Sequence, residues 1–242
     1  MAVASSTGGF SPAILIVLFA AVVIAVIVIG AIQAAKRRQA WQALAQRYGC
    51  SFSAADPFAI DECHPQSLFD KGDRRKAYNV LSGKIENQDV MAFDYQYTER
   101  HGTGKNRHDT TYHFTCLLLA PPIPFQRLWI RPESFLDRVG EFFGLDDIDF
   151  ESDEFSRRFF VKCPDKKFAY DILHARTMEL LLECGKIFIE AQDDSILFYY
   201  SGSLRVPEDV AMLIQRGLRF LELIPSYLIE QKWERPDATR NV

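Results

Sequence analysis

The first 35 residues contain no aspartate, glutamate, lysine or arginine. Within this uncharged segment, residues 13–32 form a run of twenty residues that are all apolar or glycine. At about 1.5 Å per helical residue, such a run spans about 30 Å, the thickness of the hydrocarbon core of a bilayer. We therefore predict a transmembrane helix over residues 13–35, preceded by a short extracytoplasmic tail over residues 1–12.

The N-terminus also lacks the basic start of a secretory signal, and its apolar run exceeds the length of about 7–15 residues that such signals have. A retained anchor is therefore favoured over a cleaved signal. The first cations, Lys36, Arg37 and Arg38, follow the run directly. The positive-inside rule then places the N-terminus outside and everything after residue 35 in the cytoplasm. We expect a single-pass protein of the bacterial inner (plasma) membrane.

Cysteine is scarce: the chain has five, an odd number, and no two stand in a C-x-x-C pair. This excludes a disulfide framework and a zinc finger as readings of the pattern. His101, His108 and His113 lie close together, but no acid or cysteine stands at a recognised ligand spacing from them. We predict no metal site and no cofactor.

Catalytic motifs are missing as well. The chain contains no G-x-S-x-G elbow and no H-E-x-x-H pair, so no pattern identifies a catalytic residue. The segment GTGKN resembles the end of a phosphate-binding loop, but Glu99 occupies the position of its first glycine and Asn106 that of its Ser or Thr. An enzyme whose site is assembled from distant residues stays open as an alternative.

An excess of positive charge is absent too, because the net charge is −4. Proteins that bind nucleic acid usually carry a basic excess, so we expect no nucleic-acid partner. The expected partners are the lipid bilayer and another membrane or cytoplasmic protein.

The rest of the chain predicts an α+β domain. A juxtamembrane helix over residues 36–49 and an irregular connection over 50–75 precede a soluble domain over 76–233, and a flexible tail covers 234–242. Alternating apolar residues predict an antiparallel meander with strands at 77–85, 90–97, 111–120 and 128–130. Pro132 begins a predicted helix containing Phe135, Val139, Phe142 and Phe143.

In the second half, the pattern predicts a helix at 174–184 that stops at Gly185, a hairpin turning at Asp193 and Asp194, and a helix from Pro207 that Pro225 kinks or divides. The soluble part is either one domain or two lobes, 76–145 and 146–233.

A basic segment, TERHGTGKNRHDT at residues 98–110, joins two predicted strands and is longer than such a turn needs. Its cations Arg100, Lys105 and Arg107, together with Lys36, Arg37 and Arg38, are candidates for contact with anionic lipid or a partner. A solvated hairpin tip is the alternative.

An acidic segment, DDIDFESDEFSRRFFV at residues 146–161, does not fit a calcium loop because Arg158 stands where the last ligand would be. We interpret it as a short strand with Ile148 and Phe150 inward, then a helical turn capped by Ser152 or Asp153. The solvent-exposed side of that strand, formed by Asp147, Asp149 and Glu151, is a candidate contact surface for a basic partner.

The segments IDFESDEFSRRFFV, KKFAYDIL and MELLL resemble a family of bacterial membrane-anchored proteins with a domain of unknown function. The earlier segment NVLSGKIENQDVMAFDYQY is similar to the strand region of that family. The similarity covers residues 40–200 and is carried by Phe150, Phe155, Phe159, Phe168, Tyr170, Leu173, Met178, Leu181 and Leu182. The resemblance implies a shared fold and membrane attachment, and it implies no activity, substrate or catalytic residue.

Taken together, these features favour a membrane-tethered, non-enzymatic interaction or scaffolding domain. The alternatives are an enzyme, for example a hydrolase, and a carrier of an apolar ligand. An enzyme predicts a pocket that gathers His113 with acids, and a carrier predicts a roomy cavity under the aromatic face of the strands.

Overall fold

The computed structural model of the chain describes residues 12–102, 107–134, 148–203 and 207–230. The chain divides into two compact units, Met1–Ala40 and Trp41–Val242.

Helix α1 (Pro12–Tyr48) contains the uncharged run and the basic residues after it. Among the described residues it is the one helix long and apolar enough to cross a membrane, and an 18-residue stretch of it has a mean hydropathy of 3.4. The side chains of residues 13–36 are exposed. The helix ends at Tyr48, before Gly49, whose φ of 66° is accessible to glycine at little cost.

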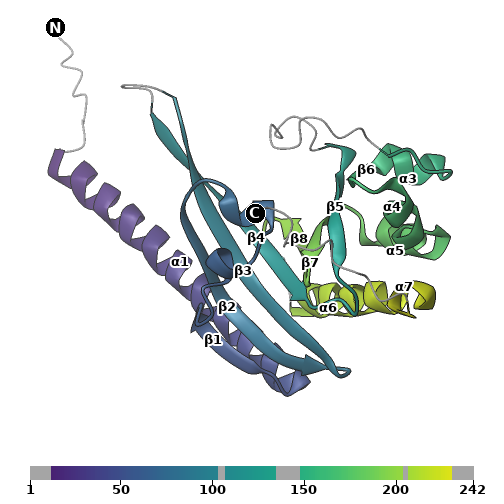
Figure 1. The fold of residues 1–242 in the computed structure, drawn as a ribbon. Coiled ribbons are helices and arrows are strands. Elements are labelled where there is room, and N and C mark those ends of the chain that lie inside the picture. The colour runs from purple at the N-terminus through teal and green to yellow at the C-terminus, as the bar shows by residue number, and fades with distance from the viewer. Residues whose placement is uncertain (1–11, 103–106, 135–147, 204–206, 231–242) are drawn as a thin grey trace, which may run out of the picture. The chain divides into compact units, whose positions relative to one another are not determined.

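One sheet of eight strands forms the centre of the second unit, in the order β1-β2-β3-β4-β8-β7-β5-β6 (Figure 1). All pairings between these neighbours are antiparallel. The predicted α+β class is confirmed. The strands are β1 (Ser51–Ala55), β2 (Asp73–Ile85), β3 (Gln88–His101), β4 (His108–Leu119), β5 (Phe125–Pro132), β6 (Phe159–Lys162), β7 (Phe188–Asp193) and β8 (Ser195–Ser201).

Strands β2, β3 and β4 form the predicted meander. Glu86 and Asn87 join β2 to β3, and their φ values of 50° and 63° are those that a tight two-residue hairpin turn requires. The predicted hairpin of β7 and β8 also turns at Asp193 and Asp194, since Gln192 pairs with Ser195.

Strand β5 exists where predicted, but it is not the fourth strand of the meander. The hairpin β7–β8 occupies the position beside β4, so that Leu117 pairs with Phe198, and β5 pairs with β6 and β7 instead. Strands from residues 76–145 and from residues 146–233 therefore belong to one sheet.

The prediction of an irregular connection over residues 50–75 was wrong. Residues 50–75 contain the edge strand β1, helix α2 (Ile60–Cys63) and the short 3-10 helix η1 (Ser67–Asp70). The serines and alanines of β1 have weak strand propensity, and the strand forms because it pairs with β2. Pro132 ends β5 opposite Phe159, where proline is tolerated, and Glu133 and Ser134 directly after it are in a 3-10 turn. The predicted helical residues Phe135, Val139, Phe142 and Phe143 lie outside the described residues.

The remaining helices are α3 (Asp153–Arg158), α4 (Lys166–Ile172), α5 (Ala175–Cys184), α6 (Pro207–Glu222) and α7 (Ser226–Glu230). The predicted stop at Gly185 is confirmed, and Pro225 divides the last helical region into α6 and α7.

The two faces of the sheet are covered differently. On the face that we call the helical face, side chains of the strands pack in one cluster with residues of α1, α3, α4, α5, α6 and α7, including the buried Trp41 and Leu44 of α1. The opposite face is covered by residues 56–72, which we call the strap and which contain α2 and η1. Ile60, Leu68 and Phe69 of the strap pack there on an aromatic cluster that includes Phe93, Tyr95, Tyr97, Phe114 and Tyr199.

Candidate functional site

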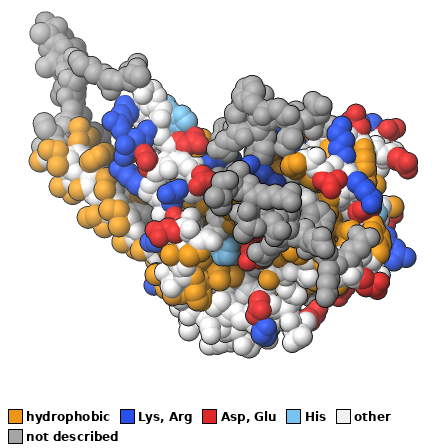
Figure 2. Space-filling model, in the orientation of Figure 1, with side chains coloured by type: hydrophobic (Ala, Val, Ile, Leu, Met, Phe, Trp, Pro, Cys, Tyr) orange, Lys and Arg blue, Asp and Glu red, His pale blue; other side chains and the backbone are white. Residues whose placement is uncertain are grey.

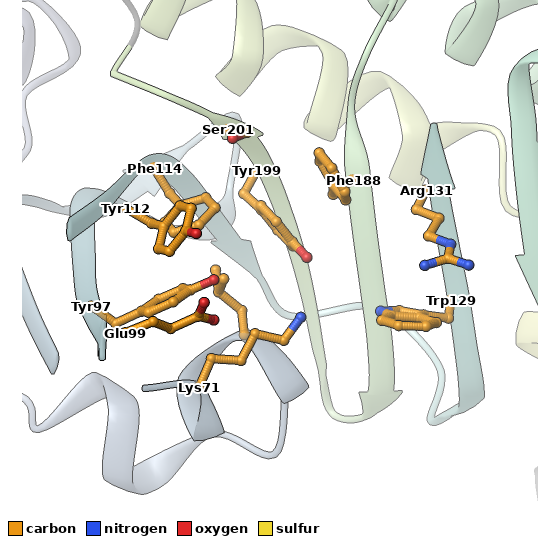
Figure 3. Close-up of a pocket in the computed structure, with 11 residues that line it drawn as sticks. Lys71, Tyr97, Glu99, Tyr112, Phe114, Trp129, Arg131, Phe188, Tyr199 and Ser201 are labelled. Atoms are coloured by element: carbon orange, nitrogen blue, oxygen red, sulfur yellow. The ribbon is translucent and has the colours of Figure 1, made fainter. Parts of the chain in front are cut away.

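A pocket of about 100 Å³ lies on the strap face of the sheet. It extends from β3 and β4 across β8 and β7 to β5, and the end of the strap contributes Leu68 and Lys71 (Figure 3). Strand alternation explains this membership, because every second residue of each strand points to the same face. The lining residues are Leu68, Lys71, Tyr97, Glu99, Tyr112, Phe114, Trp129, Arg131, Phe188, Tyr199 and Ser201.

Aromatic rings form most of the wall. Tyr97 stacks on Phe114 with ring centroids 5.4 Å apart and an angle of 19°, and Phe188 stacks on Tyr199 at 4.9 Å and 10°. Figure 3 shows the first pair with Tyr112 on one side of the pocket and Trp129 on the other. Such pairs hold each other's ring planes, so the wall is preformed.

Three charged side chains line the same pocket: Lys71, Glu99 and Arg131. Arg131 is buried, and its guanidinium carbon lies 5.3 Å from the ring centre of Trp129 and 4.6 Å from that of Phe160. Both distances are within the range of a cation–π interaction, which fixes the plane of the guanidinium. Lys71 and Glu99 are only half-buried and lie at the mouth.

A buried carboxylate holds the strap on the sheet beside the pocket. Glu190 of β7 accepts hydrogen bonds from the Ser67 hydroxyl (2.9 Å), the Leu68 amide (3.3 Å) and the Tyr199 hydroxyl (2.7 Å). Gln66 of the strap adds a bond of 2.7 Å to the Ser195 hydroxyl. A buried carboxylate needs such partners, so this hydrogen-bond network explains how Glu190 can be buried and gives it a structural role.

Burial also favours the protonated form of three thiols and of Tyr199. Burial raises the pKa of Cys163 and of Cys184 to about 11, and it raises the pKa of Cys116 well above its usual value. The pKa of Tyr199 is raised by burial and by the neighbouring charge of Glu190. These three thiols are therefore protonated at neutral pH, unlike activated cysteine nucleophiles.

The histidines do not line this pocket, although His101 Nε2 lies 3.5 Å from the carboxylate of Glu99. His113 is exposed on β4 and does not line it, and His101 lies beside His108 with ring centroids 5.4 Å apart. Within the described residues, no group of three or more His, Cys, Asp or Glu side chains could hold a metal ion.

The predicted basic segment is organised differently from the prediction. Strands β3 and β4 continue to the pair His101 and His108, so only residues 102–107 connect them. A sequence pattern of alternating apolar residues could not reveal this, because both ends of the hairpin are polar. Lys105 lies outside the described residues, and Arg107 is exposed.

Ion pairs reduce the free positive charge at this end of the sheet. Arg100 lies 3.5 Å from Asp73, and Arg74 lies 3.5 Å from Asp109. Figure 2 accordingly shows blue and red side chains interleaved there. In α1, Lys36 and Arg38 are exposed and Arg37 is half-buried.

The acidic segment folds largely as interpreted. The Ser152 hydroxyl caps α3 by accepting from the Phe155 amide (3.3 Å), and Arg158 pairs with Glu154 at 3.2 Å. Asp149 and Glu151 are exposed and do not line the pocket, whereas Asp147 lies outside the described residues.

The segment around residue 150 is not a strand, although the buried Ile148 and Phe150 alternate with exposed acids as predicted. A backbone hydrogen bond from the Ile148 amide to the Val161 carbonyl (3.1 Å) joins it to β6.

Sequence patterns predicted only part of what forms the pocket. The alternation in residues 90–97 and 111–120 predicted two strands with an aromatic face, which contributes Tyr97, Tyr112 and Phe114. Trp129, Arg131 and Phe188 reach that face only because the β7–β8 hairpin joins β4 to β5, and no local pattern encodes this order.

No protein-family model and no curated protein sequence matches this chain. The fold is similar to the crystal structure of the mycobacterial trehalose monomycolate transport factor A, TtfA, with a TM-score of 0.54 and 12% sequence identity. The similarity covers 78% of this chain and 96% of that chain. At this identity the comparison establishes a shared fold for nearly the whole of TtfA.

Proposed function

We propose that this chain is a single-pass membrane protein whose folded unit acts as a non-enzymatic accessory domain in lipid transport. The observation that carries the proposal is a combination: an apolar helix of membrane-spanning length precedes a fold shared with 96% of a chain described as a transport factor. The similarity to the transport factor supports a role in transport, and the apolar helix supports a location in the membrane.

The proposed location is the inner membrane, with the N-terminus outside and the folded unit in the cytoplasm. The positive charges that follow the apolar run favour this orientation. In this arrangement Lys36, Arg37 and Arg38 contact lipid headgroups. Arg100 and Arg107, and the exposed acids Asp149 and Glu151, are available to a membrane or cytoplasmic protein partner.

A non-enzymatic role agrees with what the buried ionisable groups do. Glu190 holds the strap, Arg131 lies between two aromatic rings, and burial keeps three thiols protonated. Enzymes usually shift such groups toward reactivity at neutral pH, and the thiols here are shifted away from it.

Deletion of the gene in its host, followed by mass spectrometry of lipids from separated membranes, tests the proposal. A transport factor moves a molecule without changing it. We therefore expect one lipid to accumulate in the membrane where it is made and to decrease at its destination, with no new mass.

A complementing wild-type copy should restore the distribution. If deletion instead produces an unprocessed precursor of different mass, the chain acts as an enzyme, and an unaltered lipid distribution would also contradict the proposal.

The pocket favours a second candidate, a carrier that encloses an apolar ligand. Its size argues against a whole lipid, because about 100 Å³ is smaller than the cavity of about 150 Å³ that admits a single benzene. A group as large as a benzene ring therefore enters only in part: the pocket can enclose one edge of a ring or a few methylenes, with the rest of the ligand outside.

A further inference from the structure

We propose that the pocket on the strap face binds one edge of a neutral hydroxylated ring, the sugar headgroup of a lipid, while the rest of the ring and the acyl chains stay outside. The inference rests on the proposed role in lipid transport for its biological meaning and names the ligand class of that role. The binding itself is argued from the lining of the pocket.

The aromatic wall suits the faces of a sugar ring. A pyranose presents C–H groups on its faces, and the rings of Tyr97, Tyr112 and Trp129 offer flat apolar surfaces on opposite sides of the pocket (Figure 3). Pockets of this kind use aromatic surface for affinity and a few polar groups for orientation.

The polar groups suit the edge of the ring. Hydroxyl groups both donate and accept hydrogen bonds, and the pocket offers both kinds of partner. Lys71 and Arg131 donate, the Glu99 carboxylate accepts, and the Ser201 hydroxyl does either.

An acyl chain fits these groups less well. It would remove water from Lys71 and Glu99 without replacing the lost hydrogen bonds, which is costly for charged groups. An isolated anion such as phosphate would meet Lys71 and Arg131, but also the negative charge of Glu99 in the same pocket. A neutral polyol can form hydrogen bonds with Lys71, Arg131 and Glu99 without repelling any of them.

The test uses the full chain labelled with 5-fluorotryptophan in phosphatidylcholine nanodiscs, which avoids glycoside detergents that would compete. The chain has three tryptophans, and of the two that the structure describes, Trp41 and Trp129, Trp129 lines the pocket. Its fluorine resonance is assigned with Trp129→Phe, and the probes are methyl glucoside, hexanoate and inorganic phosphate.

Methyl glucoside should shift the Trp129 resonance saturably, and neither hexanoate nor phosphate should do so. The variants Lys71→Met and Glu99→Gln should each weaken binding about tenfold, the effect of losing one good polar contact. Lys84→Met, which removes an exposed cation paired with Asp89 outside the pocket, should bind like wild type. An unchanged Trp129 resonance without ligand shows that a variant keeps its fold.

A shift by hexanoate or phosphate but not by methyl glucoside overturns the inference, as does the absence of any shift. Neither result affects the proposed function, because that is tested by lipid distribution in the host. Sugar binding combined with a normal distribution in the deletion strain would instead contradict the proposed function alone.

Discussion

The two faces of the sheet differ in how completely they are covered. On the helical face, six helices contribute to one apolar cluster around side chains such as Phe198, which packs edge-on against Phe220 of α6 at 5.3 Å. On the strap face, a short segment with few apolar residues covers part of the sheet and leaves a pocket with three charged side chains. The helical face accounts for stability, and the strap face is the part available for recognition.

The largest contrast is expected from two phenylalanines on neighbouring strands. Phe198→Ala should lower the free energy of unfolding by about 3–5 kcal/mol, because it leaves a cavity in a closed core. Phe188→Ala, at a half-buried ring in the pocket, should cost about 1–2 kcal/mol. Urea unfolding of the full chain in detergent micelles, followed by circular dichroism, measures both. Equal losses would contradict the difference between the faces.

Removal of the buried carboxylate should loosen the strap. Glu190→Ala leaves three donors without their acceptor and should cost about 2–3 kcal/mol. Hydrogen exchange should increase in residues 60–70 while the helical face stays protected. Glu222→Ala removes an exposed partner of Arg219 and should cost about 0–1 kcal/mol. Uniform faster exchange over the whole sheet would show that the strap is not a separate layer.

The last residue of the strap, a glycine, should be sensitive to a single methyl group. Gly72 has a φ of 60°, and a Cβ there would lie 2.7 Å from the Thr98 carbonyl oxygen. Gly72→Ala should therefore cost about 2 kcal/mol and displace the adjacent Lys71. Gly49→Ala is the control, because its φ is 66° but its Cβ would meet no atom within 4 Å. Similar losses at both sites would mean that backbone strain, not contact with β3, decides the cost.

The smallest effect is expected at alkaline pH. The folded-state pKa values of Cys163 and Cys184 are raised from 9.0 to about 11, so folding favours the neutral thiols. Their contribution to stability is complete below pH 9 and is lost as the pH rises toward 11. A Cys163→Ala/Cys184→Ala variant should show a shallower decline of melting temperature between pH 9 and pH 11. If the melting temperatures of the wild type and the variant fell in parallel, the two thiols would not contribute to the pH dependence of stability.

Sequence patterns predicted those parts of the fold that depend on neighbouring residues. The apolar run of α1, the alternation in β3 and β4, the Ser152 cap and the stop at Gly185 are local signals, and all have counterparts in the structure. The position of β5 beside β7 and the edge strand β1 depend on long-range pairing, which local composition does not encode.

The candidate site was less predictable for the same reason. Cations were the obvious signal in residues 98–110, yet Arg100 is paired with Asp73 in the structure. The pocket instead combines one predicted aromatic face with Trp129, Arg131 and Phe188, which the strand order brings beside it. A charged motif is visible in a sequence, whereas a pocket across five strands requires the topology.

Complementation of the deletion strain tests most directly whether the strap face carries the function. A Lys71→Met/Glu99→Gln variant changes two charges at the pocket, and Lys84→Met/Asp89→Asn changes an exposed ion pair outside it. At equal abundance in the membrane, the account predicts that the second variant restores the lipid distribution and the first does not. Full restoration by the pocket variant would contradict it.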